Sequence, residues 1–253
     1  MANVHIFDQK EFYSRLAEAI AKAAKESIKA SDRFTVALSG GTTPIGLYEE
    51  IVKGGHLTEK EIAKTYFFFG DERDVSPESA RSNFKLAKDL LFKPLKVKIP
   101  NIIRWPTEII NAAEVAVKYD QAIRRFFRLE EGEFPRFDLV ILGLGDDCHT
   151  ASLFPNTEAL KEESRIAVMN RVEKLDTNRL TLTFPAINNS KRIFFAVTGS
   201  KKAEALREAI EGKRNCSRFP AQCIEPNDGE VVWFADKEAA SALSKKVSKA
   251  GKR

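Results

Sequence analysis

Apolar side chains recur along this chain with two different periods. Over residues 8–30 and 112–127 they are spaced three and four residues apart, with lysine and glutamate between them, which predicts two amphipathic helices. Shorter helices are expected over residues 45–52, about 83–91, 150–154, 203–210 and 237–249, and Pro185 is a further helix-start signal.

Short runs of β-branched, aliphatic and aromatic residues separate these helices. They predict strands at residues 34–39, 65–70, 137–142, 192–198 and 231–235, and Ile102 and Ile103 suggest one very short strand. Residues 166–169 and 179–184 alternate like strands as well. Because strands alternate with helices throughout, we expect a single α/β domain over residues 1–253, with a three-layer architecture and a largely parallel, Rossmann-like sheet flanked by helices.

Net charge and composition change this picture little. The 253 residues are 43% hydrophobic and 30% charged, typical of a globular protein, and no apolar run is long enough to span a membrane. The net charge is +5 and the isoelectric point about 9.0. Five positive charges lie in a basic tail at about residues 245–253, which leaves the body formally neutral. We therefore expect neither nucleic acid nor a membrane as a partner.

The beginning of the chain and its cysteines predict a cytoplasmic location. No basic segment followed by an apolar one opens the sequence, so no secretory signal is expected. The three cysteines, Cys148, Cys216 and Cys223, are odd in number and have no metal-binding spacing. We expect reduced thiols and neither a disulfide framework nor a metal site.

The richest candidate for chemistry is the segment FDLVILGLGDDCHTASLFP, residues 137–155. Its apolar start predicts a buried strand, and Gly143 and Gly145 then allow a sharp turn. Asp147 and His149 follow at the carboxyl end of that strand, where α/β folds bind ligands. An imidazole beside a carboxylate is suited to general-base catalysis. A dinucleotide fingerprint is rejected because cysteine replaces its third glycine and two aspartates would repel a pyrophosphate.

Two other turns leave predicted strands with polar groups. Residues 39–44, SGGTTP, offer free backbone N–H groups, two hydroxyls and a helix start, which suits a phosphate, although a plain turn explains the glycines equally well. Asp71 and Arg73 directly follow the strand at residues 65–70. They could bind hydroxyls and an anion respectively, or form a solvated charged turn.

Together these segments resemble the 6-phosphogluconolactonase family, which belongs to the wider group containing glucosamine-6-phosphate deaminases. The resemblance extends over nearly the whole chain through SGGTTP, GDER, SN, GLGDDCHTASLFP, RLTLT, TGSKKA, FPA and WFAD, which begin at Ser39, Gly70, Ser82, Gly143, Arg179, Thr198, Phe219 and Trp233. It implies a cytoplasmic hydrolase of carboxylic esters that converts 6-phospho-D-glucono-1,5-lactone to 6-phosphogluconate in the oxidative pentose phosphate pathway. No cofactor or metal is implied, and we expect a monomer or a small homo-oligomer.

The resemblance also implies roles for individual residues. His149 would activate water, with Asp147 assisting. Gly40, Gly41, Thr42 and Asp71 would contact the sugar acid, and Arg73, Arg179 and Lys202 would lie near the substrate, with the basic side chains serving its phosphate. Because the serine elbow Gly-x-Ser-x-Gly is not found in the sequence, we expect direct attack by water without a covalent intermediate.

The chain departs from the family pattern at two positions. Cys148 and Asn156 stand where glycine is usual, and a non-glycine residue resists positive φ, so the backbone at Cys148 is of particular interest. The Cys148 thiol, next to two carboxylates, is expected to stay protonated.

Two alternative functions remain open from the sequence. A glucosamine-6-phosphate deaminase or isomerase would use a carboxylate such as Asp71 to move a proton between sugar carbons. A non-catalytic sugar-phosphate sensor would keep the fold and bind ligand without turnover.

Overall fold

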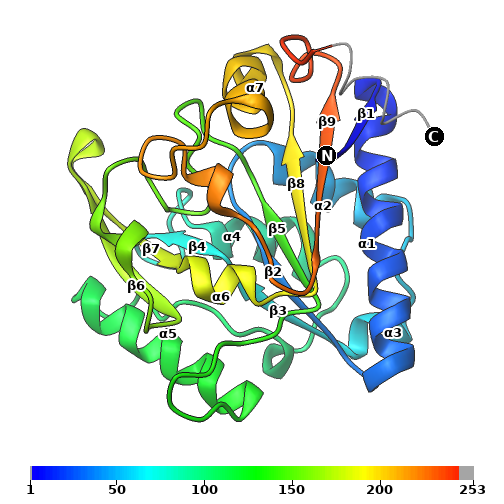
Figure 1. Ribbon diagram of the computed structural model, residues 1–253. Helices are drawn as coiled ribbons and strands as arrows, with labels where there is room; N and C mark the ends of the chain where they lie inside the picture. Colours follow the sequence, from blue (N-terminus) through cyan, green and yellow to red (C-terminus); the bar gives the residue numbers. More distant parts are fainter. Residues whose placement is uncertain (1, 245–253) are drawn as a thin grey trace.

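The computed structural model describes residues 2–244, and within them six strands form one parallel sheet (Figure 1). The strand order is β1-β9-β8-β5-β2-β3. The bounds are Asn3–Phe7 (β1), Phe34–Leu38 (β2), Thr65–Phe69 (β3), Leu139–Leu142 (β5), Arg192–Val197 (β8) and Glu230–Asp236 (β9). β2 and β5 are buried along their whole length, which explains their unbroken apolar sequences.

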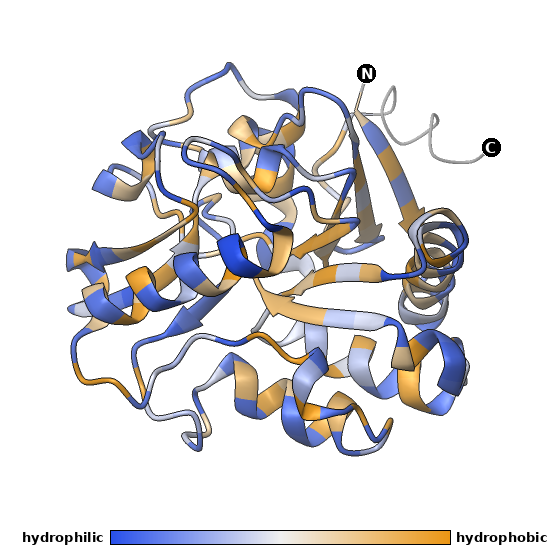
Figure 2. Ribbon diagram, turned by 90° about the horizontal axis from the view of Figure 1, so that it is seen from below, coloured by the Kyte–Doolittle hydropathy of each residue, from blue (hydrophilic) through white to orange (hydrophobic). Residues whose placement is uncertain are grey.

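Helices cover both faces of this sheet. The longer ones are α1 (Gln9–Ser31), α2 (Thr43–Lys53), α5 (Ala112–Phe127) and α7 (Ala203–Glu211). The shorter ones are α3 (Glu59–Ala63), α4 (Asn83–Ala87), η1 (Lys88–Phe92), η2 (Ile99–Asn101), η3 (Glu158–Lys161), η4 (Glu173–Leu175), α6 (Phe184–Asn188), η5 (Ser200–Lys202) and η6 (Pro220–Cys223). Figure 2 shows hydrophobic residues along the central strands and on one side of the helices.

Successive side chains of β3 illustrate how the layers form. The ring of Phe67 packs on Phe92 of η1, and the ring of Phe68 packs on Phe126 of α5, at centroid distances of 5.1 Å in both cases. Neighbouring residues of a strand point to opposite faces, so η1 and α5 lie on opposite sides of the sheet. α1 and α2 contact each other, and α2 contacts η1, which places these helices in one layer. The predicted three-layer α/β class is therefore confirmed.

A second, antiparallel sheet lies beside the first and was not predicted. It has the order β4-β7-β6, with bounds Asp71–Arg73 (β4), Thr177–Leu182 (β7) and Ala167–Val172 (β6). β6 and β7 cover the two segments that were expected to alternate like strands. β4 was expected only as a charged segment after β3 that either binds a ligand or forms a solvated turn. β4 leaves the parallel sheet directly after Gly70, where the Leu182 N–H bonds to the Gly70 carbonyl at 2.8 Å. This pairing makes a strand from residues that are too polar to predict as one.

Several smaller predictions were wrong. The first strand, β1, was not expected, although it pairs with β9 over five residues. Residues 150–154 form an isolated bridge between Thr150 and Leu153 rather than a helix, and Ile102 makes only an isolated bridge with Phe67. In the predicted helix at residues 237–249, the part up to residue 244 consists mainly of turns. The remainder, together with most of the basic tail, lies outside the described residues.

The cysteines also correct the sequence analysis. Cys216 and Cys223 form a disulfide, with their Cα atoms 5.6 Å apart, and Cys148 is a buried free thiol. The expectation of three reduced thiols is wrong because a turn of the chain brings two cysteines seven residues apart within bonding distance. Sequence spacing alone did not reveal this turn.

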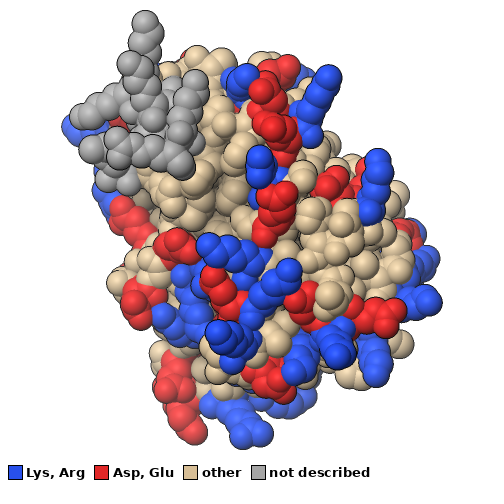
Figure 3. Space-filling view, turned by 90° about the vertical axis from the view of Figure 1, so that its right-hand side faces the viewer, with Lys and Arg blue, Asp and Glu red and all other residues tan. Residues whose placement is uncertain are grey.

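Surface charge and helix lengths bear on the expected partners. On the face shown in Figure 3, acidic and basic side chains are interspersed. No helix within residues 2–244 combines the length and the apolar character needed to cross a membrane. Nothing in the fold tests whether the chain binds nucleic acid, and that expectation stays a prediction.

Candidate active site

A cavity of about 440 Å³ lies at the carboxyl edge of the parallel sheet. β2 and β5 are neighbours there. β3, which follows β2 in the chain, lies on one side of β2, and β5, which comes later, lies on its other side, so the strand order reverses at this point. Crevices at such a reversal of strand order are the usual ligand sites of open α/β sheets. The cavity is lined by Asp71, Arg73, Asp146, Asp147, His149, Ala151, Ser152, Phe154, Lys174, Leu175, Arg179 and Lys202.

His149 reaches the cavity because the turn after β5 contains glycine. A Cβ on Gly145 would lie 2.0 Å from His149 Nδ1, a distance that real Cβ atoms do not reach. The Gly145 N–H also donates to the His149 carbonyl at 2.8 Å. The imidazole stacks on the Phe154 ring at a centroid distance of 4.0 Å. The ring is thus clamped between the turn backbone and an aromatic side chain.

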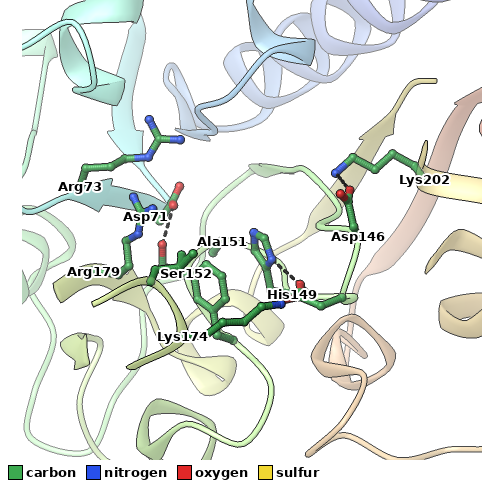
Figure 4. Close-up of a pocket in the computed structure, with 12 residues that line it drawn as sticks. Asp71, Arg73, Asp146, His149, Ala151, Ser152, Lys174, Arg179 and Lys202 are labelled. Atoms are coloured by element: carbon green, nitrogen blue, oxygen red, sulfur yellow. Dashed lines mark hydrogen bonds and ion pairs between the residues drawn. The ribbon is translucent and has the colours of Figure 1, made fainter. Parts of the chain in front are cut away.

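Asp147 orients the imidazole. Its Oδ1 lies 2.6 Å from His149 Nδ1 and accepts the His149 backbone N–H at 3.2 Å (Figure 4). Burial opposes ionisation of this carboxyl, but the hydrogen bonds from His149 and the charge of Lys174, 3.7 Å away, lower the pKa of Asp147 to about 2. Asp147 is therefore ionised at neutral pH and favours a proton on Nδ1, which leaves Nε2 as the acceptor.

Asp71 is held by two segments that are distant in sequence. Its Oδ2 accepts the Ser152 hydroxyl at 2.8 Å, and its Oδ1 accepts Asn83 Nδ2 at 3.2 Å. A Cβ on Gly40 would lie 1.8 Å from Asn83 Oδ1, so the glycine makes room for this amide. Asp71 is 8% exposed and joins the start of α4 to the segment that follows His149.

The neighbouring carboxylate Glu72 fixes the backbone on both sides of the Asp71–Asn83 contact. It is 1% exposed and accepts the backbone N–H groups of Arg73, Asn83 and Phe84 at 2.7–2.8 Å, as well as the Ser82 hydroxyl at 3.0 Å. Burial raises the pKa of Glu72, whereas those backbone bonds act in the opposite direction. Glu72 thus attaches β4 to the start of α4.

Arg73 and Arg179 stand directly opposite each other in the β4–β7 ladder. Arg73 donates to the Arg81 carbonyl at 2.8 Å, and Arg179 Nε is buried with no partner among the described residues. Burial and the charge of Arg73 lower the pKa of Arg179. Like charges at directly opposed positions repel, so the pair favours an anion between or beside them.

Lys202 lies on the other side of His149 from the two arginines, as Figure 4 shows. It forms an ion pair with Asp146, which is largely exposed. Lys174 belongs to η4, which connects β6 and β7, and its Nζ lies 3.7 Å from Asp147 Oδ2. The cavity therefore has basic groups at two separate ends.

Of the residues expected at the site, Asp71, Arg73, Asp147, His149, Arg179 and Lys202 line one cavity. Gly40, Gly41 and Thr42 do not line it: Gly40 packs on Asn83, Gly41 turns with φ +97°, and Thr42 occupies the N-cap position of α2 without a capping side-chain bond. Sequence reasoning missed Ser152, Lys174 and Phe154. No local pattern marks the first two, and the stacking of Phe154 depends on the unexpected turn at residues 150–154.

Cys148 and Asn156, the two departures from the glycine pattern, adopt left-handed backbone, with φ values of +62° and +58°. Ala151 between them is left-handed as well, with φ +48°. Cys148 is 1% exposed and its thiol donates to the Ala205 carbonyl at 3.2 Å. Burial and the nearby Asp147 and Glu208 raise the pKa of Cys148 to about 11, as expected for a protonated thiol. Within residues 2–244, no group of three or more His, Cys, Asp or Glu could hold a metal ion.

Comparison with known proteins identifies close relatives of this arrangement. The family model described as glucosamine-6-phosphate isomerases/6-phosphogluconolactonase matches residues 7–233. A 6-phosphogluconolactonase of Nostoc sp. is 38% identical over 237 residues, covering 94% of this chain and 96% of the relative. A 6-phosphogluconolactonase of Synechocystis sp. is 38% identical over 209 residues, covering 83% and 84% respectively.

Solved structures agree with these sequence relatives. The 6-phosphogluconolactonase from Trypanosoma cruzi superposes with a TM-score of 0.83 and 26% identity, covering 96% of this chain and 97% of the other. The 6-phosphogluconolactonase from Thermotoga maritima superposes with a TM-score of 0.80 and 26% identity, covering 94% and 100%. The fold is thus shared with this group over most of this chain.

Proposed function

This chain belongs to the family of glucosamine-6-phosphate isomerases and 6-phosphogluconolactonases, and we propose that it hydrolyses 6-phospho-D-glucono-1,5-lactone to 6-phosphogluconate in the pentose phosphate pathway. The observation that carries the mechanism is the 2.6 Å contact between Asp147 Oδ1 and His149 Nδ1 inside the basic cavity. A lactone is an activated ester, so its hydrolysis needs a positioned water, a base and anchoring of the substrate.

His149 is the proposed general base. With Nδ1 bonded to Asp147, Nε2 takes a proton from water as the water oxygen attacks the lactone carbonyl. The ring C–O bond then breaks, and the leaving alkoxide takes the proton back from His149 Nε2. The carboxylic acid that remains ionises to the carboxylate and releases one proton to solvent. Phe154 and Gly145 hold the ring on its two sides, so little orientational freedom is lost when water attacks.

The phosphate is proposed to bind at Arg73 and Arg179. The unpartnered Nε of Arg179 and the opposed positive charges of the two side chains support this assignment. Binding energy from the phosphate, remote from the reacting carbonyl, then orients the lactone against His149. Lys202, at the opposite end of the cavity, is proposed to face the sugar-acid portion of the substrate.

Asp71 and the Gly40–Thr42 turn are proposed to position the sugar acid, Asp71 through its remaining lone pairs and the turn through Asn83. Both carboxylate oxygens of Asp71 already accept hydrogen bonds from Ser152 and Asn83. This arrangement suits an acceptor for sugar hydroxyls better than a base that shuttles protons between carbons. Asp71 therefore gives no support to the deaminase alternative.

We propose that the reaction takes place in the cytoplasm and that the enzyme is a monomer or a small homo-oligomer. The substrate carries a phosphate charge that is costly to move through a bilayer, so the enzyme must work where the lactone is formed. Cell fractionation and light scattering test the two assignments.

The decisive experiment is proton release from freshly generated 6-phosphoglucono-1,5-lactone. Purified protein should accelerate release far beyond the spontaneous background, and His149→Asn should reduce kcat about 10²-fold to 10⁴-fold while circular dichroism stays unchanged. His56→Asn serves as the matched control, because His56 lies outside the cavity and pairs with Glu50.

Three outcomes would change the proposal. Folded protein with no rate above background would remove the lactonase function. Ammonia release from glucosamine 6-phosphate would favour the deaminase, and tight binding of 6-phosphogluconate without turnover would favour the sensor. A fully active His149→Asn would leave the lactonase in place but remove the proposed base.

A further inference from the structure

The disulfide lies in a loop that contacts the His149 segment directly. We call residues 216–223 the disulfide loop and residues 148–156 the catalytic loop. The Ala221 N–H donates to the Cys148 carbonyl at 3.0 Å, and the Asn156 N–H donates to the Ser217 carbonyl at 2.9 Å. The Ser217 hydroxyl also donates to Asn156 Oδ1 at 3.0 Å. The disulfide loop thus holds both ends of the catalytic loop.

Those two ends, Cys148 and Asn156, are the positions at which this chain has another residue where glycine is usual in the family. Cys148 and Asn156 adopt φ values of +62° and +58°. A non-glycine residue persists in this region only where surrounding contacts hold it there. At both positions, backbone hydrogen bonds with the disulfide loop supply such contacts. His149 directly follows Cys148, so its ring depends on the same backbone.

The disulfide keeps the loop that makes these contacts compact. Ser217 and Ala221 both lie between Cys216 and Cys223. Next to the disulfide, the Asn215 backbone N–H donates to Gln222 Oε1 at 2.6 Å. Breaking the disulfide removes the covalent closure of an otherwise irregular segment that carries η6. The backbone groups of Ser217 and Ala221 then spend less time in bonding position.

The disulfide is accessible to a reductant. Both cysteines are partly exposed, and Ser217 and Arg218 beside Cys216 are exposed. Arg214 Nη2 lies 3.7 Å from Cys223 Sγ, and a nearby cation stabilises the thiolate that leaves when the bond is cleaved. By contrast, the Cys148 thiol is buried.

We propose that the Cys216–Cys223 disulfide loop is a positioning element for His149, and that its reduction by a dithiol lowers the activity of the enzyme. A dithiol thiolate attacks one sulfur and forms a mixed disulfide, and its second thiol then displaces that sulfur. Two electrons and two protons pass to the protein, the S–S bond becomes two thiols, and the dithiol becomes its own disulfide. This inference rests on the proposed lactonase function for its kinetic readout.

The test compares oxidised protein with protein reduced by dithiothreitol, with mass spectrometry confirming the gain of two hydrogens. Reduction should lower kcat about tenfold with KM nearly unchanged, because misplacement of a catalytic group affects the reacting step more than remote binding. Cys216→Ser/Cys223→Ser should behave like the reduced protein and should not respond to dithiothreitol.

A matched glycine variant separates positioning from general stability. In Cys148→Gly/Asn156→Gly the backbone hydrogen bonds to Ala221 and Ser217 can still form, and both positions adopt positive φ without penalty. The Ser217 hydroxyl loses its Asn156 Oδ1 acceptor equally in the oxidised and the reduced form. This variant should keep similar kcat values in its oxidised and reduced forms. If it loses as much activity on reduction as the wild type, or if the wild type loses none, the inference is wrong.

Nuclear magnetic resonance of the three histidine rings makes the test independent of turnover. The His149 ring signals should shift on reduction, whereas those of His5 on β1 and His56 after α2 should not. Unchanged His149 signals would overturn the inference even if the proposed function holds, and shifted signals would support it even if no lactone is hydrolysed. If the double serine variant does not fold, Ser217→Ala with the disulfide intact should still lower kcat about threefold through loss of one hydrogen bond.

Discussion

The imidazole of His149 lies so close to the backbone of Gly145 that no side chain fits between them, since a Cβ there would be 2.0 Å from Nδ1. Gly145→Ala should therefore push the ring away from Asp147 and Phe154. We expect a loss of about 10²-fold in kcat from misplacement on the order of 1 Å. Proton-release kinetics measure this loss.

Gly143→Ala is the matched control for that substitution. A Cβ on Gly143 would meet only Ser39 Oγ at 3.7 Å, an ordinary contact. Its activity should stay near that of the wild type. Equal losses of kcat in the two variants would show that the activity depends on the backbone freedom of the glycines in this turn and not on the space beside the imidazole.

The ion pair of Asp147 and His149 should make stability depend on pH in the acid range. The folded-state pKa of Asp147 is about 2, below its ordinary value of 3.8. A lowered pKa contributes stability above about pH 4, and that contribution is lost as pH falls toward 2. The difference in unfolding free energy between wild type and Asp147→Asn should therefore shrink from pH 4 to pH 2. Urea unfolding at each pH measures it, and a constant difference would contradict the assignment.

Arg179 should determine recognition of the phosphate. Arg179→Met removes the guanidinium, whose Nε is buried, and keeps much of the side-chain volume. We expect kcat/KM for the phosphorylated lactone to fall about 10-fold to 100-fold, with little change for unphosphorylated glucono-1,5-lactone. Arg171→Met, on the neighbouring β6 and paired with Asp176, is the control. Equal losses with both lactones would place the phosphate elsewhere.

Cys148 should react slowly with thiol reagents in the folded protein. Its pKa is raised from 9.0 to about 11, which lowers the thiolate fraction at pH 8 about 100-fold, and burial slows access further. After reduction, two thiols should react rapidly and the third only on unfolding. Rapid labelling of three thiols in native protein would contradict the burial of Cys148.

The sequence alone determined the central strands and the proximity of the proposed catalytic pair. β2, β3, β5 and β8 are predominantly apolar because both faces of a parallel sheet are buried, and this local property is visible in the sequence. Asp147 and His149 stand on one turn directly after β5, so their proximity follows from two residues of separation. The amphipathic pattern of α1 and α5 was equally local.

Tertiary structure decided the features that depend on pairing between distant segments. β4 is a strand only because β7 supplies its partners, and this pairing places Arg179 opposite Arg73. Ser152 reaches Asp71 across 81 positions, and no local pattern marks a contact of that kind. Lys174 enters the cavity from the connection between β6 and β7, whose antiparallel pairing was not predicted. The disulfide and the left-handed backbone of Cys148 and Asn156 likewise depend on how separate loops pack, since the free energy that holds them comes from contacts between those loops.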